Sequence, residues 1–370
     1  MTISKQIKSK ISKEGLLTIS LDEVNVPEPN DGEVLIKVQA TPINPSDLGL
    51  LVGPADITSL REVAKGSLVE MQVPDGLIRS VAARFDQNLP VGNEGAGIVE
   101  AAGKGAEHLI GKVVGVAGGA MYSEYRCLPA MSCLEMNEGT SSEQAASCFV
   151  NPLTALGMVE TMRLEDHTGL VHTAAASNLG QMLVKICSQE DIPLVNIVRK
   201  EEHVELLKSL GAKYVCNSSL DTFMEDLVNA LVETGSTLGF DATGGGKLAS
   251  QILTAMEIAA NKTATEYSRY GSDQYKQVYI YGGLDRNPTT LTRSFGFSWG
   301  LGGWLLTPFI GRIGQERFGE LRQRVANEID TTFESSYSKV ISLSEALEEQ
   351  NILSYTKQAT GEKYLIKPDS

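Results

Sequence analysis

The most constraining feature of this sequence is an alternation of short apolar segments and longer amphipathic segments between residues 169 and 281. The short segments suit buried strands, and the longer ones carry apolar residues at helical spacing. Strands that alternate with helices in this way form a parallel sheet covered on both faces, so we expect an α/β fold. The expected strands are 169–173, 193–198, 214–216, 238–241 and 277–281, and the expected helices are 178–189, 201–210, 221–234 and 247–260.

The first expected strand leads into a loop of small residues at 174–180. Against the phosphate-binding pattern G-x-G-x-x-G, the three glycine positions hold Ala175, Ser177 and Gly180. This match is weak, and an ordinary strand-to-helix turn would look similar. Small residues nevertheless allow a diphosphate to approach the backbone and the N–H groups of the helix start, so the context favours a dinucleotide site. The candidate contacts are Ala175, Ser177, Asn178, Leu179 and Gly180.

The end of the second expected strand bears on which dinucleotide binds. An acidic residue about 20 positions beyond the glycines would hold the ribose 2′-hydroxyl of NAD. Arg199 and Lys200 stand there instead, and such cations suit a 2′-phosphate, so we expect NADPH rather than NADH. The alternative is a solvated helix start, because Glu201 and Glu202 follow.

The first 140 residues read as a β-rich domain. Short β-branched and apolar runs at 34–38, 97–101 and 112–116 predict strands of a compact barrel or sandwich. Residues 54–92 show no clear pattern.

Composition excludes several classes of protein. With 370 residues, 42% of them hydrophobic and 21% charged, the chain is globular and long enough for two domains. Its net charge of −14 argues against nucleic acid as a partner. The five scattered cysteines indicate reduced thiols, and no apolar run follows the charged N-terminus, so we expect a cytoplasmic protein. The uncharged stretch 294–311 contains five glycines and a proline. These residues interrupt a helix, so a buried or interface segment is favoured over a membrane helix.

Eight motifs together resemble the medium-chain dehydrogenase/reductase superfamily, in particular its zinc-free quinone oxidoreductase and 2-enoyl thioester reductase branch. The resemblance covers nearly the whole chain apart from residues 54–92, and it implies a Rossmann cofactor-binding domain at 146–324. A GroES-like catalytic domain at 1–145 and 325–370 and a homodimer are also implied. The motifs are 41–47 (TPINPSD), 91–99 (VGNEGAGIV), 150–155 (VNPLTA), 174–180, 208–212 (KSLGA), 240–245 (FDATGG), 281–283 (YGG) and 359–363 (ATGEK).

The same resemblance argues against zinc. The zinc alcohol dehydrogenases place Cys, His and Cys ligands at positions that hold Asn44, Asn93 and about Val150 in this chain. Cys127, Cys133 and Cys148 do not supply the four closely spaced cysteines of a structural zinc lobe, so we expect no metal.

Without a metal, hydrogen-bond donors must stabilise the charge that develops on the acceptor. Asn44 and Ser46 carry suitable donors, and Asp47 more plausibly orients the loop. A turn built from turn-forming residues is the alternative explanation of this segment. The enoyl thioester reductases use a Tyr shortly after it as a proton donor, whereas no Tyr precedes Tyr122 in this chain.

Further cofactor contacts follow from the resemblance. Asn151 and Thr154 match positions beside the nicotinamide, and Lys363 matches a position near the 2′-phosphate, although a solvated lysine is the simpler expectation for it. Tyr281, Gly282 and Gly283 end a strand, and the small residues would let the ring approach the backbone. Aromatic residues after them either line the nicotinamide pocket or form a dimer interface: Phe295, Phe297 and Trp299.

These observations predict a zinc-free oxidoreductase that transfers hydride from NADPH to a small-molecule acceptor, a quinone or an α,β-unsaturated carbonyl. Two alternatives stay open: an enoyl thioester (enoyl-CoA) reductase with another proton donor, and a non-catalytic NADPH-binding regulatory protein.

Overall fold

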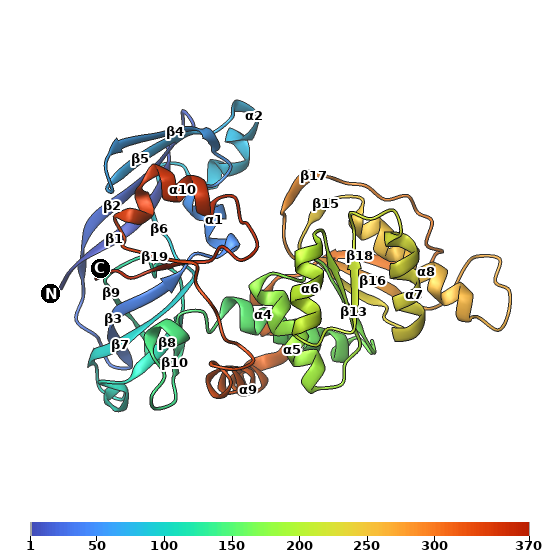
Figure 1. Cartoon of the computed structure of the whole chain (residues 1–370). Helices are drawn as coiled ribbons and strands as arrows, with labels where there is room; N and C mark the ends of the chain where they lie inside the picture. Colours follow the sequence, from blue (N-terminus) through green and yellow to red (C-terminus); the bar gives the residue numbers. More distant parts are fainter. Residues whose placement is uncertain (1, 370) are drawn as a thin grey trace. The chain divides into compact units, whose positions relative to one another are not determined.

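The computed structural model describes residues 2–369 and divides them into two compact units. Unit 1 consists of residues 1–150 and 322–370, and unit 2 consists of residues 151–321. Figure 1 shows that both ends of the chain, in blue and red, contribute to unit 1, whereas the green and yellow middle of the chain forms unit 2.

Unit 1 is built from two sheets. The five-stranded sheet has the order β4-β5-β2-β1-β6, and the seven-stranded sheet has the order β10-β8-β7-β3-β20-β19 with β9 paired to β3. The strands are β1 (Thr2–Ile11), β2 (Leu16–Val26), β3 (Glu33–Pro42), β4 (Asp56–Ala64), β5 (Leu68–Gln72), β6 (Leu89–Pro90), β7 (Glu94–Ala102), β8 (Val113–Ala117), β9 (Tyr125–Pro129), β10 (Cys133–Glu135), β19 (Lys339–Ile341) and β20 (Tyr364–Ile366). Short helices connect them: α1 (Pro45–Leu51), α2 (Asp75–Ile78), α3 (Ser142–Ala145) and α10 (Glu349–Tyr355).

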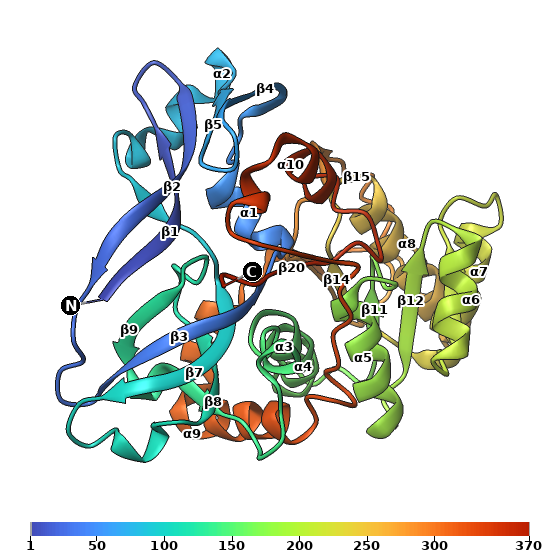
Figure 2. The ribbon, with the colours of Figure 1, turned by 60° about the vertical axis from the view of Figure 1, so that its left-hand side comes forward.

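The expected strands 34–38 and 97–101 lie within β3 and β7, and the expected strand 112–116 overlaps β8. Residues 54–92, which show no clear sequence pattern, contain β4 and β5 and extend the sheet formed by β1 and β2. The C-terminal segment completes the other sheet, because β20 pairs with β3 through Leu365–Pro42 and Ile366–Thr41 (Figure 2). Residues far apart in sequence are therefore needed to form one domain.

Unit 2 contains the predicted parallel sheet. Its strand order is β13-β12-β11-β14-β16-β18, and every neighbouring pair is parallel. The strands are β11 (Leu170–His172), β12 (Leu194–Val198), β13 (Tyr214–Asn217), β14 (Leu238–Asp241), β16 (Lys276–Ile280) and β18 (Trp299–Gly303), with a small separate pair β15 (Gly244–Gly246) and β17 (Asp285–Thr289). The helices are α4 (Val150–Leu164), α5 (Asn178–Gln189), α6 (Glu201–Ser209), α7 (Phe223–Thr234), α8 (Leu248–Thr263) and α9 (Leu306–Asn327).

The direction of chain progression reverses at the centre of this sheet. From β11 the chain proceeds through β12 to β13 on one side, and it returns to place β14, β16 and β18 on the other side. Such a reversal opens a crevice at the carboxyl ends of the two central strands, which is where open parallel sheets bind ligands. The loops that follow β11 and β14 are therefore the candidate binding loops of unit 2.

The aromatic stretch after residue 294 differs from the sequence-based expectation. Phe295 is fully buried, and its ring packs edge-to-face on Trp299 with the centroids 4.7 Å apart. Phe295 therefore belongs to the core of unit 2, and neither proposed role, pocket wall or interface, was right for it. Phe297 is 84% exposed.

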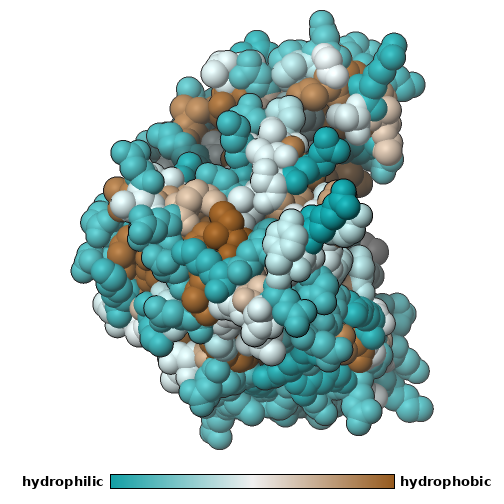
Figure 3. All heavy atoms as spheres, turned by 90° about the vertical axis from the view of Figure 1, so that its right-hand side faces the viewer, coloured by the Kyte–Doolittle hydropathy of each residue, from teal (hydrophilic) through white to brown (hydrophobic). Residues whose placement is uncertain are grey.

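None of the helices within residues 2–369 combines the length and the apolarity that a membrane crossing requires. The face in Figure 3 is mostly hydrophilic, with hydrophobic residues in scattered patches.

Unit 2 also contains a buried ion pair. The Lys276 ammonium and the Glu257 carboxylate are 2.7 Å apart, and their side chains are 0% and 6% exposed. The other Glu257 oxygen accepts hydrogen bonds from the Ser272 N–H and the Asn261 amide. Two buried opposite charges with added hydrogen bonds are mutually dependent, since removal of one leaves the other uncompensated.

We therefore expect Lys276→Met to lower the free energy of unfolding by about 3 kcal/mol, and Lys276→Met/Glu257→Met to lower it by less. Both tryptophans, Trp299 and Trp304, lie in unit 2, so urea unfolding followed by tryptophan fluorescence reports on this unit. Lys262→Met, at an exposed position of α8, is the control and should change little. An equal loss in the single and double variants would contradict the mutual dependence.

Candidate active site

The segment between β3 and α1 gathers three of the predicted residues in unit 1. Asn44 stands at the N-cap of α1, and Pro45 occupies the first helical position, where its missing N–H is not needed. Asn44 and Asp47 are buried, whereas Ser46 is exposed. Residues 44–47 are thus the N-cap and first turn of α1, and this helix start places the side chains of Asn44 and Asp47 inside the unit.

Asp47 holds two loops together. Its Oδ2 accepts the Asn44 N–H at 2.8 Å, and its Oδ1 accepts the Asn93 N–H at 2.8 Å. Burial raises the pKa of Asp47 to about 7, against the opposing effect of these two N–H donors. Both carboxylate oxygens are therefore committed to the protein backbone.

Glu94 is a buried charged residue that contacts this segment and that the sequence analysis did not single out. Its side chain is fully buried, and Oε1 accepts the Asn44 amide at 2.7 Å. Oε2 accepts the N–H groups of Phe149 and Val150, both at 2.8 Å, at the start of α4. Burial raises the pKa of Glu94, and the nearby Lys363 ammonium opposes this rise. The motif VGNEGAGIV contained the signal, because an acidic residue among small apolar ones is unusual in a buried strand.

Lys363 is not the solvated lysine that we expected as the simpler case. It is half-buried, and its Nζ donates to the Ser147 hydroxyl at 2.7 Å. The Ser147 hydroxyl also shares a hydrogen bond with the Tyr337 hydroxyl at 2.9 Å. Burial lowers the pKa of Lys363 to about 8, while Glu94 and Asp47 counteract this effect.

In unit 2, the loop after β11 forms a tight turn into α5. A Cβ atom on Gly180 would lie 2.1 Å from the Ala175 carbonyl oxygen, so only glycine fits there. Ala175 is fully buried, and the Ser177 hydroxyl caps the helix by accepting the Gly180 N–H at 3.2 Å. Asn178 and Leu179 form the first turn of α5, whose leading N–H groups have no partner within the helix.

Arg199 and Lys200 directly follow β12 and are exposed. Lys200 forms an ion pair with Glu202 at 3.0 Å, whereas Arg199 has no ion-pair partner among residues 2–369. Arg199 is thus the better placed of the two to accept an anionic ligand.

The segment 281–283 follows β16. The Tyr281 hydroxyl lies 2.7 Å from His172 Nε2, so this side chain is turned towards the sheet, and the Tyr281 N–H donates to the Asp241 carbonyl oxygen at 3.0 Å. Burial lowers the pKa of His172 to about 3, so its ring is neutral. A Cβ atom on Gly282 would lie 2.6 Å from the Ala242 carbonyl oxygen, while Gly283 has open space around it. In α4, Thr154 is buried and Asn151 is half-buried.

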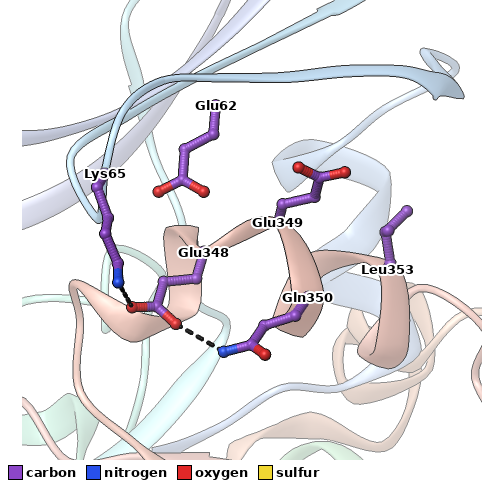
Figure 4. A pocket seen from close by; sticks show the side chains of 6 residues that line it. All are labelled: Glu62, Lys65, Glu348, Glu349, Gln350 and Leu353. Carbon is purple, nitrogen blue, oxygen red and sulfur yellow. Dashed lines mark hydrogen bonds and ion pairs between the residues drawn. The ribbon is translucent and has the colours of Figure 1, made fainter.

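One pocket lies in unit 1 and is lined by none of these residues. It has a volume of about 430 Å³ and is lined by Glu62, Lys65, Glu348, Glu349, Gln350 and Leu353 (Figure 4). Its three carboxylates outnumber the single ammonium, and Glu348 is engaged by Lys65 at 3.7 Å and Gln350 at 2.9 Å. A pocket of this charge would repel phosphate groups, so it is a poor candidate for the dinucleotide.

The structure contains no group of three or more His, Cys, Asp or Glu side chains arranged to hold a metal ion within residues 2–369. All five cysteines are free thiols.

Comparisons with known proteins agree with this architecture. The sequence profile of the alcohol dehydrogenase GroES-like domain matches residues 30–174. A zinc-type alcohol dehydrogenase-like protein of Schizosaccharomyces pombe is 30% identical over 282 residues, which cover 73% of this chain and 74% of that protein. This chain belongs to the medium-chain dehydrogenase/reductase superfamily. The resemblance to this superfamily, predicted from the motifs, is confirmed.

Two further members of the superfamily are similar over different extents. The mitochondrial enoyl-[acyl-carrier-protein] reductase of Caenorhabditis elegans is 26% identical over 208 residues, which span 54% of this chain and only about half, 53%, of that relative. A crystal structure of a Mesorhizobium loti protein named as an NADPH:quinone reductase shares the fold over 100% of both chains, with a TM-score of 0.74 and 24% identity. The predicted combination of a parallel-sheet domain and a GroES-like domain is thereby confirmed.

The environment of Lys363 gives a pH-dependent prediction. Acetylation requires the neutral amine, so its rate at Lys363 should rise with pH around a midpoint of about 8 in the folded protein. Denaturation in urea should return the midpoint to the ordinary lysine range near ~10.4. Competitive labelling with isotopic acetic anhydride, followed by mass spectrometry, measures the midpoint in the folded and in the denatured protein.

Glu94→Gln should move the Lys363 midpoint to lower pH, because the carboxylate that favours the ammonium form is gone. Ser147→Ala is the control that removes a hydrogen bond without removing a charge. A midpoint in the ordinary range for the folded wild type, or an upward shift in Glu94→Gln, would show that this environment is wrongly described.

Proposed function

We propose that this chain is a zinc-free oxidoreductase that uses NADPH to reduce a small-molecule acceptor, a quinone or an α,β-unsaturated carbonyl. The observation that carries the proposal is the turn at the carboxyl end of β11, where Gly180 admits no Cβ and α5 begins. This turn adjoins the point at which the strand order reverses, which is the usual location of a dinucleotide in such a sheet.

The residues of unit 2 fit a dinucleotide. The diphosphate would lie against the start of α5, formed by Ala175, Ser177, Asn178, Leu179 and Gly180, where the positive end of the helix dipole favours negative charge. Arg199 would pair with the 2′-phosphate. The backbone of 281–283 and the side chains of Asn151 and Thr154 would border the nicotinamide.

Bound NADPH would supply the hydride from C4 of its nicotinamide ring. The chain itself would orient the acceptor and stabilise negative charge on its oxygen with neutral donors, because the positions of the expected zinc ligands hold the amides Asn44 and Asn93. Asp47 is enclosed by backbone N–H groups, so it would position the loop.

Reduction of an enoyl thioester is the second candidate, favoured by the similarity to mitochondrial enoyl-[acyl-carrier-protein] reductases. Against it, Tyr122 is the first tyrosine after the 41–47 motif, and it is fully buried with its hydroxyl 3.2 Å from the Pro42 carbonyl oxygen. A tyrosine so enclosed is a poor proton donor for a substrate. A regulatory protein that binds NADPH without turnover is the third possibility.

Steady-state NADPH oxidation separates the three functions. We expect turnover with 1,4-benzoquinone or 3-buten-2-one and much slower turnover with crotonyl-CoA. Faster turnover with crotonyl-CoA would favour the enoyl reductase. Tight NADPH binding without oxidation by any acceptor would favour the regulatory protein.

Cofactor preference should depend on Arg199. We expect Arg199→Ala to weaken NADPH binding roughly 10- to 100-fold and to leave NADH binding unchanged, because one charge-assisted phosphate contact contributes about 1.5–3 kcal/mol. Titration of the fluorescence of either reduced cofactor measures this. Lys208→Ala removes an exposed charge near the other end of α6 and is the matched control. Equal NADPH affinity in wild type and Arg199→Ala would exclude the phosphate contact.

We further propose a homodimer in a reducing compartment such as the cytoplasm, where the five free thiols would stay reduced. Within residues 2–369, β18 pairs only with β16 and leaves one edge of the sheet open. An open edge is a site for pairing with another chain, and Phe297 and Leu305 beside it are 84% and 64% exposed. A second copy could extend the sheet across this edge.

Phe297→Asp should therefore raise the dimer dissociation constant at least about tenfold, because it places a charge in the interface. Sedimentation equilibrium measures the constant. Met131→Asp, at an equally exposed position of unit 1, should leave it unchanged. A wild type that is monomeric at all concentrations would exclude the dimer.

A further inference from the structure

Unit 2 contains a buried carboxylate at the point where the strand order reverses. Asp241 is the last residue of β14, which pairs with β11 (Figure 2), and its side chain is fully buried. Its Oδ1 accepts the Thr173 hydroxyl and the Thr243 N–H, both at 2.8 Å, and its Oδ2 accepts the Gly244 N–H at 3.2 Å. These donors compensate the buried charge. The carboxylate therefore ties the loop after β14 to the residue that follows β11.

Thr173 completes this connection from the other strand. It directly follows β11 and is fully buried. Its hydroxyl donates to Asp241 and accepts the Ala242 N–H at 2.8 Å, and its own N–H donates to the Phe240 carbonyl oxygen at 3.1 Å. A hydroxyl can donate and accept at the same time, which a methyl group cannot. Replacement of this hydroxyl by a methyl group would leave both a buried carboxylate oxygen and a buried N–H without it.

The segment after β16 is held by the same residue. The Tyr281 N–H donates to the Asp241 carbonyl oxygen, and a Cβ atom on Gly244 would lie 2.6 Å from the Gly282 carbonyl oxygen. The loop after β14 thus packs closely against the segment 281–283. Asp241 contacts the chain after β11 with its side chain and the chain after β16 with its backbone.

The turn into α5 has a support of its own. The Ala175 N–H donates to the Ile197 carbonyl oxygen in β12 at 3.2 Å, and Gly180 packs on the Ala175 carbonyl oxygen. The proposed diphosphate site therefore depends on contacts towards β12, whereas Asp241 acts on the side of β14 and β16. Loss of the bond between Thr173 and Asp241 should disturb only the second side.

We propose that Asp241, through the Thr173 hydroxyl, positions the loop after β14 and the segment 281–283, and that it thereby sets the affinity of unit 2 for the nicotinamide half of the cofactor. Asp241 is fully buried, so it is a positioning residue and touches no ligand. This inference rests on the proposed NADPH-dependent function and deepens it, since it assigns the support of the nicotinamide end.

Two ligands separate the two halves of the site. NADPH spans both, whereas 2′,5′-ADP carries the adenosine and the 2′-phosphate but lacks the nicotinamide. We expect Thr173→Val to weaken NADPH binding roughly tenfold, because it removes a buried hydrogen bond to a charged group. The Kd of 2′,5′-ADP should stay at its wild-type value. Isothermal titration calorimetry measures both constants. Thr173→Ser keeps the hydroxyl and should retain the wild-type affinity for NADPH.

Thr161→Val is the matched control, because it also removes a buried hydroxyl from unit 2. Thr161 is 1% exposed, and its hydroxyl donates to the Gly157 carbonyl oxygen at 2.7 Å and accepts the Trp304 indole N–H at 3.0 Å. We expect this variant to lower the thermal unfolding midpoint about as much as Thr173→Val and to leave both Kd values unchanged. A loss of NADPH affinity alone in this control as well would exclude a specific role of Thr173.

A double-mutant cycle tests whether Thr173 acts through the Asp241 carboxylate. Asp241→Asn keeps the shape of the side chain but removes the charge and turns an N–H donor towards the Gly244 N–H, so NADPH binding should weaken. The effect of Thr173→Val on the Kd of NADPH should be smaller in the Asp241→Asn background. Fully additive effects would contradict the coupling. The comparison of Thr173→Val with Thr173→Ser remains decisive if Asp241→Asn fails to fold.

The inference and the function on which it rests fail in different ways. If the wild type binds both ligands but Thr173→Val weakens both equally or neither, the positioning role is excluded and the proposed oxidoreductase stands. If the wild type binds neither NADPH nor 2′,5′-ADP, the NADPH-dependent function itself is excluded, and the role of Asp241 with it.

Discussion

A close approach of two backbone segments at the end of β11 determines what unit 2 can bind. Gly180 lies so near the Ala175 carbonyl oxygen that even a methyl group would not fit, and α5 can therefore begin directly at the sheet edge. The short turn brings the positive end of the helix to the carboxyl ends of the strands. One glycine is sufficient here, since Ala175 and Ser177 replace the other two glycines of the common pattern and Ser177 additionally caps the helix.

In unit 1, a buried carboxylate holds together the segments that carry the candidate site residues. Glu94 binds the Asn44 side chain with one oxygen and two N–H groups at the start of α4 with the other. A fully buried charge is stable only with such compensation, and Lys363 adds a cation nearby. Asp47 links the same loops through their backbones. The polar residues of unit 1 thus form one network in which Ser46 remains the exposed hydroxyl.

Much of this fold could be predicted because local signals agreed with the tertiary structure. The helix 178–189 and the strand 238–241 have the predicted bounds, since apolar periodicity and flanking small residues mark both. Strands β4 and β5 were missed because they are half exposed and irregular. In addition, β4 pairs with β5, and the pairing of β5 with β2 depends on residues distant in sequence. Phe295 was misjudged for a related reason: an aromatic residue in a glycine-rich stretch does not reveal whether a helix covers it.

The sequence motifs name candidate site residues but do not reveal the partners of these residues. The motifs named Asn44, Ser46 and Asp47, yet only the folded chain reveals that Glu94 engages Asn44 and that Asn93 engages Ser46. The Lys363 contact with Ser147 joins residues 216 positions apart. Such contacts depend on chain topology, and no local pattern encodes them.

The most direct test of this account is a crystal structure of the protein soaked with NADPH. The account predicts that the diphosphate lies within hydrogen-bond distance of the N–H groups at the start of α5, with the 2′-phosphate beside Arg199. A diphosphate bound elsewhere, with the start of α5 left unengaged at full occupancy of the cofactor, would contradict it.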